Sequence, residues 1–200
     1  MALAVARVRY EMREIALKAK PEDMLRVSPK GTVPVLVLPN GQVLEESRDI
    51  MLFALRQHDP EDWLSDFGPD QEFLVARNDG PFKTFLDQYK YPGRYHIPME
   101  SARERGLEIL MDLESRLADS AFLAADQPRF VDVCLFPFIR QFAAVDPIWM
   151  EQTPLDRLSK WLAYFVESAL FAHVMTKFPV WESGAPAVFN DGPVIHSPID

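Results

Sequence analysis

The 200-residue sequence changes its character along its length. Up to about Phe53 it consists of short β-like runs separated by turns, whereas helical periodicities extend from about Gln71 to Lys177. Strands and helices that are segregated along a chain are typical of two domains with different secondary structure. The sequence therefore predicts an α/β domain followed by an all-α domain.

The first part of the chain contains a predicted hairpin and a predicted helix. Its candidate strands are Arg9–Ile15, Pro34–Leu38 and Gln42–Leu44. Asn40-Gly41 separates the last two, and this dipeptide readily takes the positive φ angles of a two-residue hairpin turn. Ser47 precedes the run Arg48–Leu55, so its hydroxyl is placed to cap the free amides at the start of a helix.

The second part is predicted to be helical. Helices are expected near 71–89, 101–119, 130–145, 154–164 and 167–177. In the second of these, Leu107, Leu110, Leu113 and Leu117 form one apolar stripe, which indicates packing against a core. The proline-rich end of the chain is expected to lie extended over the surface or to be mobile. We therefore expect a first domain over 1–58, a linker over 59–70, a helical domain over 71–178 and an extended C-terminal tail over 179–200.

Charge and composition exclude several classes of protein. The chain has 30 acidic and 21 basic residues, and its formal charge of −9 repels a phosphate backbone, so no nucleic-acid partner is expected. Charged residues interrupt every apolar run before it reaches the roughly 20 residues that span a bilayer, so no membrane partner is expected. Cys134 is the single cysteine, which fits a cytoplasmic protein. The four histidines are too scattered for a metal motif, so no metal is expected.

Three segments together resemble one known family. Ser28–Leu38 and Glu45–Met51, with Asn40-Gly41 between them, resemble the glutathione-binding half of cytosolic glutathione transferases, and Phe130–Phe142 resembles the buried sixth helix of their helical domain. The chain is identified as a member of the glutathione S-transferase superfamily with omega-like features. This resemblance implies an α/β thioredoxin-like N-terminal domain, an all-α C-terminal helical domain, a homodimer, and glutathione as co-substrate.

The resemblance implies that four residues of this chain bind the cysteinyl and γ-glutamyl parts of glutathione. Pro34 stands where the family has a cis peptide bond, and the exposed backbone of Val33 would pair with the cysteinyl part of the tripeptide. The alternative is that Pro34 is an ordinary edge-strand proline. Glu46 and Ser47 stand at a helix start, where they would hold the γ-glutamyl group. The alternative is a plain N-cap beside a solvated acid.

Four further residues are candidates on weaker grounds. Lys20 corresponds to the omega-class lysine that reaches the glycine carboxylate of glutathione, although it could equally be an ordinary surface lysine. Tyr89, Tyr91 and Tyr95 lie at the end of a helix that borders the electrophile pocket in the family. The alternative for these aromatic residues is packing within the domain or in a dimer interface.

Two residues of the predicted core helix are expected to be structural. Cys134 lies among apolar residues that disfavour its thiolate, so it is not expected to supply thiol chemistry. Asp132 would be the acid of the family's capping box, but Arg129 stands where the box has Ser or Thr, which puts the cap in doubt. Asp132 is therefore read as structural rather than catalytic.

The residue that would hold the glutathione sulfur is not identified. In the family it lies on a strand and helix start that precede the segment resembling Met1–Ala6, so we expect it to lie outside this chain. The absent strand would leave a gap between Arg9–Ile15 and Val35–Leu38. The implied reaction is glutathione conjugation to an electrophile, or reduction of a mixed disulfide. The alternative is a non-catalytic binding or structural protein on the same scaffold.

Overall fold

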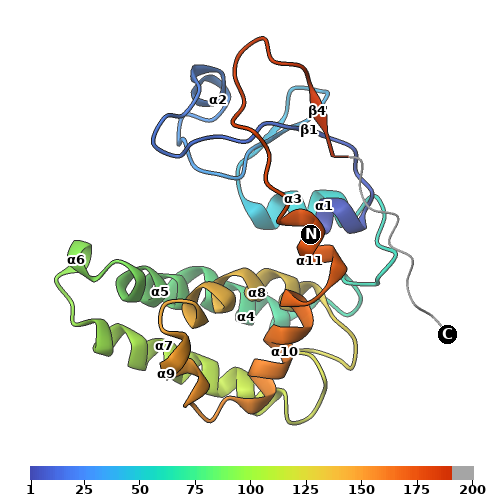
Figure 1. Cartoon of the computed structure of the whole chain (residues 1–200). Helices are drawn as coiled ribbons and strands as arrows, with labels where there is room; N and C mark the ends of the chain where they lie inside the picture. The colour runs from blue at the N-terminus through green and yellow to red at the C-terminus, as the bar shows by residue number, and fades with distance from the viewer. Residues whose placement is uncertain (191–200) are drawn as a thin grey trace. The chain divides into compact units, whose positions relative to one another are not determined.

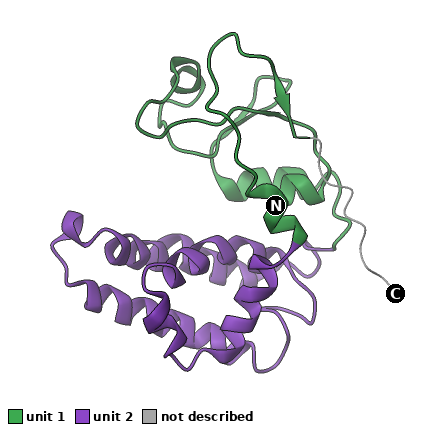
Figure 2. Ribbon diagram, viewed as in Figure 1, with its two compact units in different colours: residues 1–61, 169–200 green, residues 62–168 purple. Residues whose placement is uncertain are grey.

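The computed structural model describes residues 1–190 and divides into two compact units. The first comprises Met1–Glu61 and the residues from Ala169 onward, and the second comprises Asp62–Ser168 (Figure 2). The sequence analysis expected the helical domain to continue to residue 178, whereas this division groups the chain after Ser168 with the first unit. The expected tail over 179–200 is described only as far as residue 190.

The first unit contains short helices and very short strands (Figure 1). Its elements are α1 (Ala2–Val5), β1 (Glu11–Met12), α2 (Glu22–Val27), β2 (Leu36–Val37), β3 (Val43–Leu44), α3 (Ser47–Leu55), α11 (Ala169–Val174) and β4 (Val188–Phe189). The four strands form two separate two-stranded sheets, β1 with β4 and β2 with β3. The predicted strands are present but shorter than their sequence runs.

The predicted hairpin is β2 with β3, and its turn differs from the expected one. Leu38 and Gln42 pair through a 2.8 Å hydrogen bond from the Leu38 amide to the Gln42 carbonyl. Pro39, Asn40 and Gly41 therefore form a three-residue loop instead of a two-residue turn. Only Gly41 has a positive φ, 84°, while the Asn40 side chain accepts a 3.0 Å hydrogen bond from the Gln42 amide. The predicted two-residue turn is thus wrong, because Asn40 stabilises the loop with its side chain and keeps a negative φ.

The end of the described chain is ordered along β1. β4 runs antiparallel to β1, and the Asn190 amide donates a 3.1 Å hydrogen bond to the Tyr10 carbonyl. Further along, the Trp181 amide donates a 2.8 Å hydrogen bond to the carbonyl of Glu14. The C-terminal segment up to residue 190 therefore completes a sheet of the first unit, which the sequence analysis did not predict.

The second unit is a helical bundle (Figure 1). Its elements are α4 (Pro69–Arg77), the π-helical turn η1 (Asn78–Phe82), α5 (Lys83–Lys90), α6 (Pro92–Tyr95), α7 (Met99–Arg116), α8 (Phe130–Ala143), α9 (Pro147–Glu151) and α10 (Asp156–Val166). The single helix predicted near 71–89 is interrupted by η1, which contains Pro81. A proline without an amide hydrogen is a common cause of such a local widening.

The core of the second unit forms around α8. The buried residues of this helix include Phe130, Val131, Phe136, Ile139 and Phe142, and they lie on every side of it, as predicted for the central helix. The predicted leucine stripe of α7 packs into the same core, with Leu110, Leu113 and Leu117 buried and Leu107 half-buried. The helical part of the fold therefore follows the apolar pattern of the sequence closely.

Candidate functional site

The Val33–Pro34 turn stands immediately before the β2–β3 hairpin. Its peptide bond is cis, as predicted. The Val33 side chain is 49% exposed, and within residues 1–190 its backbone N–H and C=O form no hydrogen bond. A free backbone donor and acceptor at the entry to a strand can pair with an extended peptide. Val33 therefore has the property that the resemblance requires of it.

The start of α3 lies beyond the hairpin, and its cap differs from the predicted one. Glu46 is the N-cap residue and Ser47 is the first helical residue, so Ser47 does not cap the helix as expected. Both side chains are exposed, and neither the Glu46 nor the Ser47 side chain bonds to a helix amide. The Ser47 amide at the start of α3, which no earlier turn can satisfy, is therefore available to an anionic group.

Lys30, in the turn before Val33, forms ion pairs with the two acids that precede α3. Its ammonium lies 3.1 Å from Glu46 Oε1 and 3.9 Å from Glu45 Oε2. The hydrogen bond with Glu46 and the charge of Glu45 raise the pKa of Lys30. Buried Ser28 donates a 2.6 Å hydrogen bond from its hydroxyl to the other oxygen of Glu45. Lys30, Ser28 and Glu45 belong to the motifs quoted above, but no local pattern indicated that they would converge here.

Lys20 lies against the turn that leads to Val33. Gly31 occupies this turn with a φ of 61°, and its amide donates a 2.9 Å hydrogen bond to the Ser28 carbonyl. A Cβ at Gly31 would lie 3.6 Å from the Lys20 ammonium nitrogen. Lys30, next to Gly31, bonds to Glu46, so this turn lies next to both Lys20 and Glu46. Two of the five predicted glutathione residues, Lys20 and Glu46, therefore lie next to this turn, and Val33 and Pro34 follow it directly in the chain.

The three candidate tyrosines do not share one environment. Tyr89 is buried and its ring packs 4.9 Å from that of Phe142 and 6.5 Å from that of Trp149. Burial raises the pKa of the Tyr89 phenol. Tyr91 and Tyr95, in contrast, are 39% and 40% exposed. Tyr89 therefore has the packing role that the sequence analysis kept as an alternative, and only Tyr91 and Tyr95 present their rings to solvent.

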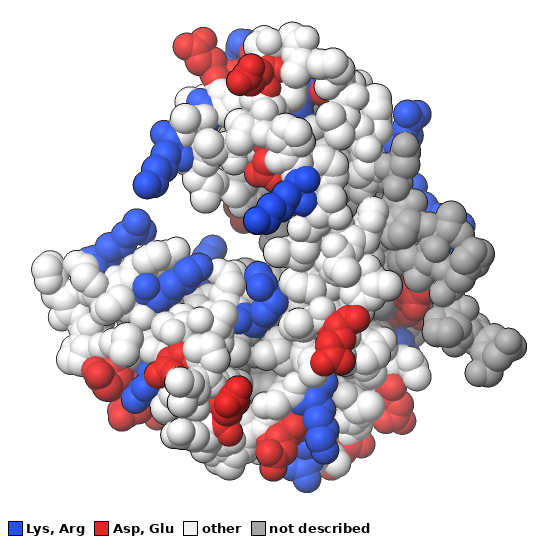
Figure 3. All heavy atoms as spheres, in the orientation of Figure 1, with Lys and Arg blue, Asp and Glu red and all other residues white. Residues whose placement is uncertain are grey.

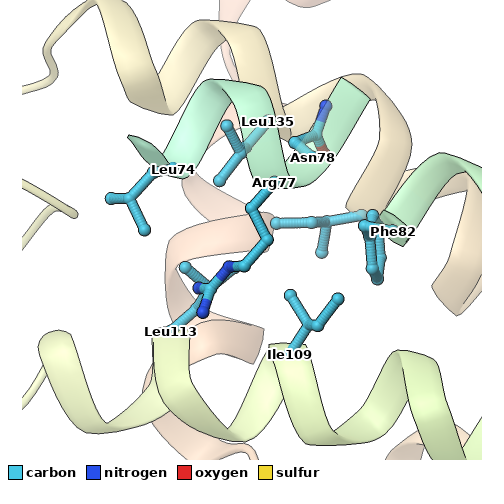
Figure 4. Close-up of a pocket in the computed structure, with 8 residues that line it drawn as sticks. Leu74, Arg77, Asn78, Phe82, Ile109, Leu113 and Leu135 are labelled. Carbon is cyan, nitrogen blue, oxygen red and sulfur yellow. The ribbon is translucent and has the colours of Figure 1, made fainter. Parts of the chain in front are cut away.

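A small, partly open cavity lies in the helical unit between α4, η1, α7 and α8 (Figure 4). It is lined by Leu74, Arg77, Asn78, Phe82, Ile109, Leu113, Leu135 and Ile139. The Arg77 side chain extends from α4 towards α7, where its guanidinium donates a 2.6 Å hydrogen bond to Asp112. None of the candidate site residues lines this cavity, and its largely aliphatic wall indicates a packing gap in the core.

Asp132 is held by backbone and indole donors. Its Oδ2 accepts a 2.9 Å hydrogen bond from the Arg129 amide, so the acidic half of the capping box forms even though Arg129 replaces Ser or Thr. Its Oδ1 accepts hydrogen bonds from the Leu123 amide at 2.9 Å and from the Trp161 indole at 2.8 Å. Burial raises the pKa of Asp132, and these donors oppose that shift. Both carboxylate oxygens of Asp132 therefore accept hydrogen bonds that stabilise the fold.

Neither a metal centre nor a membrane span is found in the part of the chain that the structure describes. Within residues 1–190, no group of three or more His, Cys, Asp or Glu side chains is arranged to hold a metal ion. Within the same residues, no helix is long and apolar enough to cross a bilayer. Cys134 is buried in α8. The candidate ligand-binding residues are therefore those of the Val33–Pro34 turn and of the start of α3 in the first unit.

An α/β unit with a cis-proline turn, followed along the chain by an all-helical unit, defines the class of protein: a thioredoxin-like domain followed by a helical domain. Residues 1–57 match the family model described as the glutathione S-transferase N-terminal domain, and residues 71–166 match that of the glutathione S-transferase C-terminal domain. The chain is 28% identical over 173 residues to glutathione S-transferase omega-1 of Mus musculus, covering 82% of this chain and 68% of that protein. The chain belongs to the glutathione S-transferase superfamily.

Solved structures support the same fold. BphK, a bacterial glutathione transferase solved as a ternary complex, aligns with a TM-score of 0.72 at 20% identity, covering 84% of this chain and 86% of that one. URE2P6 from Phanerochaete chrysosporium, solved in complex with oxidized glutathione, aligns with a TM-score of 0.71 at 21% identity, covering 86% of each chain. At these identities the likeness shows the fold, and the predicted thioredoxin-like and all-helical fold class is confirmed.

Proposed function

We propose that this protein binds glutathione in its first unit. The observation that carries the proposal is that the Gly31 turn lies against Lys20 and that the neighbouring Lys30 bonds to Glu46 at the start of α3. Val33, two residues after this turn, has a backbone that forms no hydrogen bond within the described residues. A solved relative of the same fold holds oxidized glutathione, which agrees with this assignment.

The charges of this site complement those of the tripeptide. The Ser47 amide at the start of α3 suits the γ-glutamyl carboxylate, and Glu46 accepts from the γ-glutamyl ammonium. Lys20 suits the glycine carboxylate at the other end. The N–H and C=O of Val33 pair with the cysteinyl backbone between them. The two carboxylates, the ammonium and the cysteinyl backbone of glutathione thus each have a partner of opposite charge or hydrogen-bonding role.

We propose that the bound thiol reacts as in other members of the superfamily. In conjugation, the sulfur forms a bond to an electrophilic carbon while the thiol proton and the leaving group depart. In thiol transfer, the sulfur attacks a mixed disulfide and releases the protein or small-molecule thiol. The geometry assigns no residue to hold the sulfur, since Cys134 is buried in α8. We further propose a cytoplasmic homodimer, as is implied by the family resemblance.

A second candidate is a non-catalytic binding protein on the same scaffold. The observation that favours it is that Cys134, the single cysteine of the sequence, is buried in α8, where its thiolate is disfavoured. The two candidates share the glutathione site and differ only in turnover.

Calorimetric titration of glutathione into the 200-residue chain tests the proposal. We expect a dissociation constant in the millimolar range or tighter, weakened about three- to tenfold by Glu46→Gln, because one charge-assisted hydrogen bond is lost. Glu61→Gln removes an exposed acid of the same unit away from the site and should change nothing. A folded sample that releases no heat contradicts glutathione binding. Binding without conversion of an electrophile or mixed disulfide favours the non-catalytic candidate.

A further inference from the structure

Glu46, at the start of α3, holds an ammonium group that belongs to the chain itself. Lys30 donates a 3.1 Å hydrogen bond to Glu46 Oε1. Within residues 1–190, no other side chain pairs with Glu46. The carboxylate that the proposed function assigns to the γ-glutamyl ammonium is therefore already in use.

Glu45, the preceding acid, is held more firmly than Glu46. Its side chain is 26% exposed, and its Oε1 accepts a 2.6 Å hydrogen bond from the hydroxyl of buried Ser28. Its Oε2 lies 3.9 Å from the Lys30 ammonium. The Glu46 side chain is 66% exposed and has no such anchor within the described residues. Glu45 is therefore a fixed second acceptor within reach of the same lysine.

Lys30 can change its partner without leaving the site. Its side chain is 55% exposed, and the lysine ammonium stands on a flexible four-carbon stem. A ligand ammonium that arrives at Glu46 repels Lys30, because two like charges then share one carboxylate. Transfer of Lys30 to Glu45 relieves this repulsion and leaves both acids paired.

The charge balance around Lys30 is local. Figure 3 shows Lys and Arg side chains interspersed with Asp and Glu side chains over the first unit, so neither sign of charge dominates that face. The hydrogen bond with Glu46 raises the pKa of Lys30 most, and the charges of Glu45, Glu46 and Asp49, in the first turn of α3, add to this shift. Lys30 therefore stays charged beside these acids, whichever of them it contacts.

A purely structural role explains little of this arrangement. An exposed ion pair between Lys and Glu contributes little to stability. A cation near the start of a helix is also disfavoured by the helix dipole. The Lys30–Glu46 pair is therefore easily opened, as a site that admits a charged ligand requires.

We infer that Lys30 competes with the γ-glutamyl ammonium for Glu46 and moves to Glu45 when glutathione binds. Glu45, held by Ser28, is the positioning residue that receives Lys30. Lys30 is a specificity-determining residue, because a ligand without the ammonium leaves the Lys30–Glu46 pair intact. The preference for ligands that carry the ammonium is therefore smaller than Glu46 alone would give. This inference rests on the proposed glutathione-binding function.

Calorimetric titration with a matched pair of ligands tests the exchange. The ligands are glutathione and deaminoglutathione, in which a hydrogen atom replaces the γ-glutamyl amino group, and the protein is the full chain. We expect Lys30→Met to tighten glutathione binding about two- to fivefold, because an exposed ion pair no longer has to open. The affinity for deaminoglutathione should stay the same or fall.

Glu45→Gln tests the second acceptor, and the glutamine keeps an oxygen for Ser28. Lys30 then has no neighbouring acid to receive it, so glutathione binding should weaken about two- to fivefold while deaminoglutathione binding does not. In a chain that also carries Lys30→Met, Glu45→Gln should no longer affect glutathione binding. Lys18→Met is the control, because it removes an exposed lysine of the same unit and should change neither affinity.

Two outcomes overturn the inference and leave the proposed function intact. The first is unchanged or weaker glutathione binding by Lys30→Met, which would mean that Lys30 does not compete with the ligand. The second is an equal effect of Glu45→Gln with and without Lys30. Absence of glutathione binding by both the parent chain and a Lys30→Met chain, each shown by circular dichroism to be folded, overturns the proposed function and this inference together.

Discussion

The indole N–H of Trp161 donates a 2.8 Å hydrogen bond to Oδ1 of Asp132, which joins α10 to the first turn of α8. Both residues are buried, and the same carboxylate holds the Leu123 and Arg129 amides. One acidic side chain thus organises the start of the central helix, the preceding loop and a helix from later in the chain.

Replacing this indole should destabilise the helical unit. Trp161→Phe keeps most of the aromatic packing but removes one donor from a buried carboxylate, so we expect a loss of about 1–3 kcal/mol in the free energy of unfolding. Urea denaturation followed by circular dichroism measures it. Trp149→Phe is the control, since the half-buried Trp149 ring packs against Tyr89 without reaching Asp132. Equal losses in the two variants would contradict a special role for the Trp161 bond.

The close approach of α7 to α8 should not tolerate a methyl group at Gly106. A Cβ at this position would overlap the ring of Phe142, which is buried in the core. We expect Gly106→Ala to lower the free energy of unfolding by about 1–3 kcal/mol, although alanine is the better helix former. Thermal denaturation checks this.

The matched control for that substitution is Gly93→Ala in α6, where a Cβ would meet no atom within 4 Å. It should be neutral or slightly stabilising. Adding Phe142→Leu should partly rescue Gly106→Ala if the overlap with the ring is the cause. A rescue that fails, or a Gly106→Ala chain as stable as the parent, would show that the two helices separate at little cost.

The Asp70–Arg116 pair should make stability depend on pH at the acidic end. Arg116 donates two 2.8 Å hydrogen bonds to the Asp70 carboxylate, and this interaction lowers the pKa of Asp70 from 3.8. A lowered folded-state pKa means that the pair stabilises the protein above pH 3.8 and that this stabilisation is lost as the pH falls through the folded value. Because Asp70 is largely exposed, the contribution at neutral pH should be below about 1 kcal/mol.

Comparison of Asp70→Asn with the parent chain measures this effect by urea denaturation between neutral and strongly acidic pH. The stability difference should shrink to zero as Asp70 becomes protonated. Asp119→Asn, which removes an exposed acid of the same unit, should show no such difference at any pH. A pH-independent difference for Asp70→Asn would indicate a packing effect instead of a charge effect.

The C-terminal segment should protect β1 from hydrogen exchange. Besides its backbone pairing, it places Trp181 under the Arg13 guanidinium at 4.7 Å and Phe189 under that of Arg9 at 4.3 Å. A chain that ends at Pro179 loses all of these contacts, so the β1 amides should exchange faster while those of the β2–β3 hairpin keep their protection. Exchange measured by NMR tests this. Unchanged protection of β1 would mean that the segment does not hold this strand in solution.

Several features follow from the sequence because their causes are local. A glycine is needed at residue 41 because the loop takes a positive φ there, and a cis bond is found at Val33–Pro34, where an X-Pro step makes it accessible. The apolar residues of α8 on every side of the helix indicate a buried central position. Periodicity and the quoted motifs were thus sufficient for the fold class, whereas the candidate glutathione residues remain a prediction.

Other features depend on which distant residues meet, and periodicity does not specify this. Glu114 on α7 caps the start of α10 by accepting a 2.7 Å hydrogen bond from the Leu158 amide, although nothing near α10 marks it as a cap. The same holds for the pairing of β4 with β1 and for the convergence of Lys30 on Glu46. The sequence by itself determined which residues are apolar, rigid or charged, and therefore the elements and the family. Only the tertiary structure decided their long-range partners, because a charge or an open strand edge can be satisfied by many residues and packing selects among them.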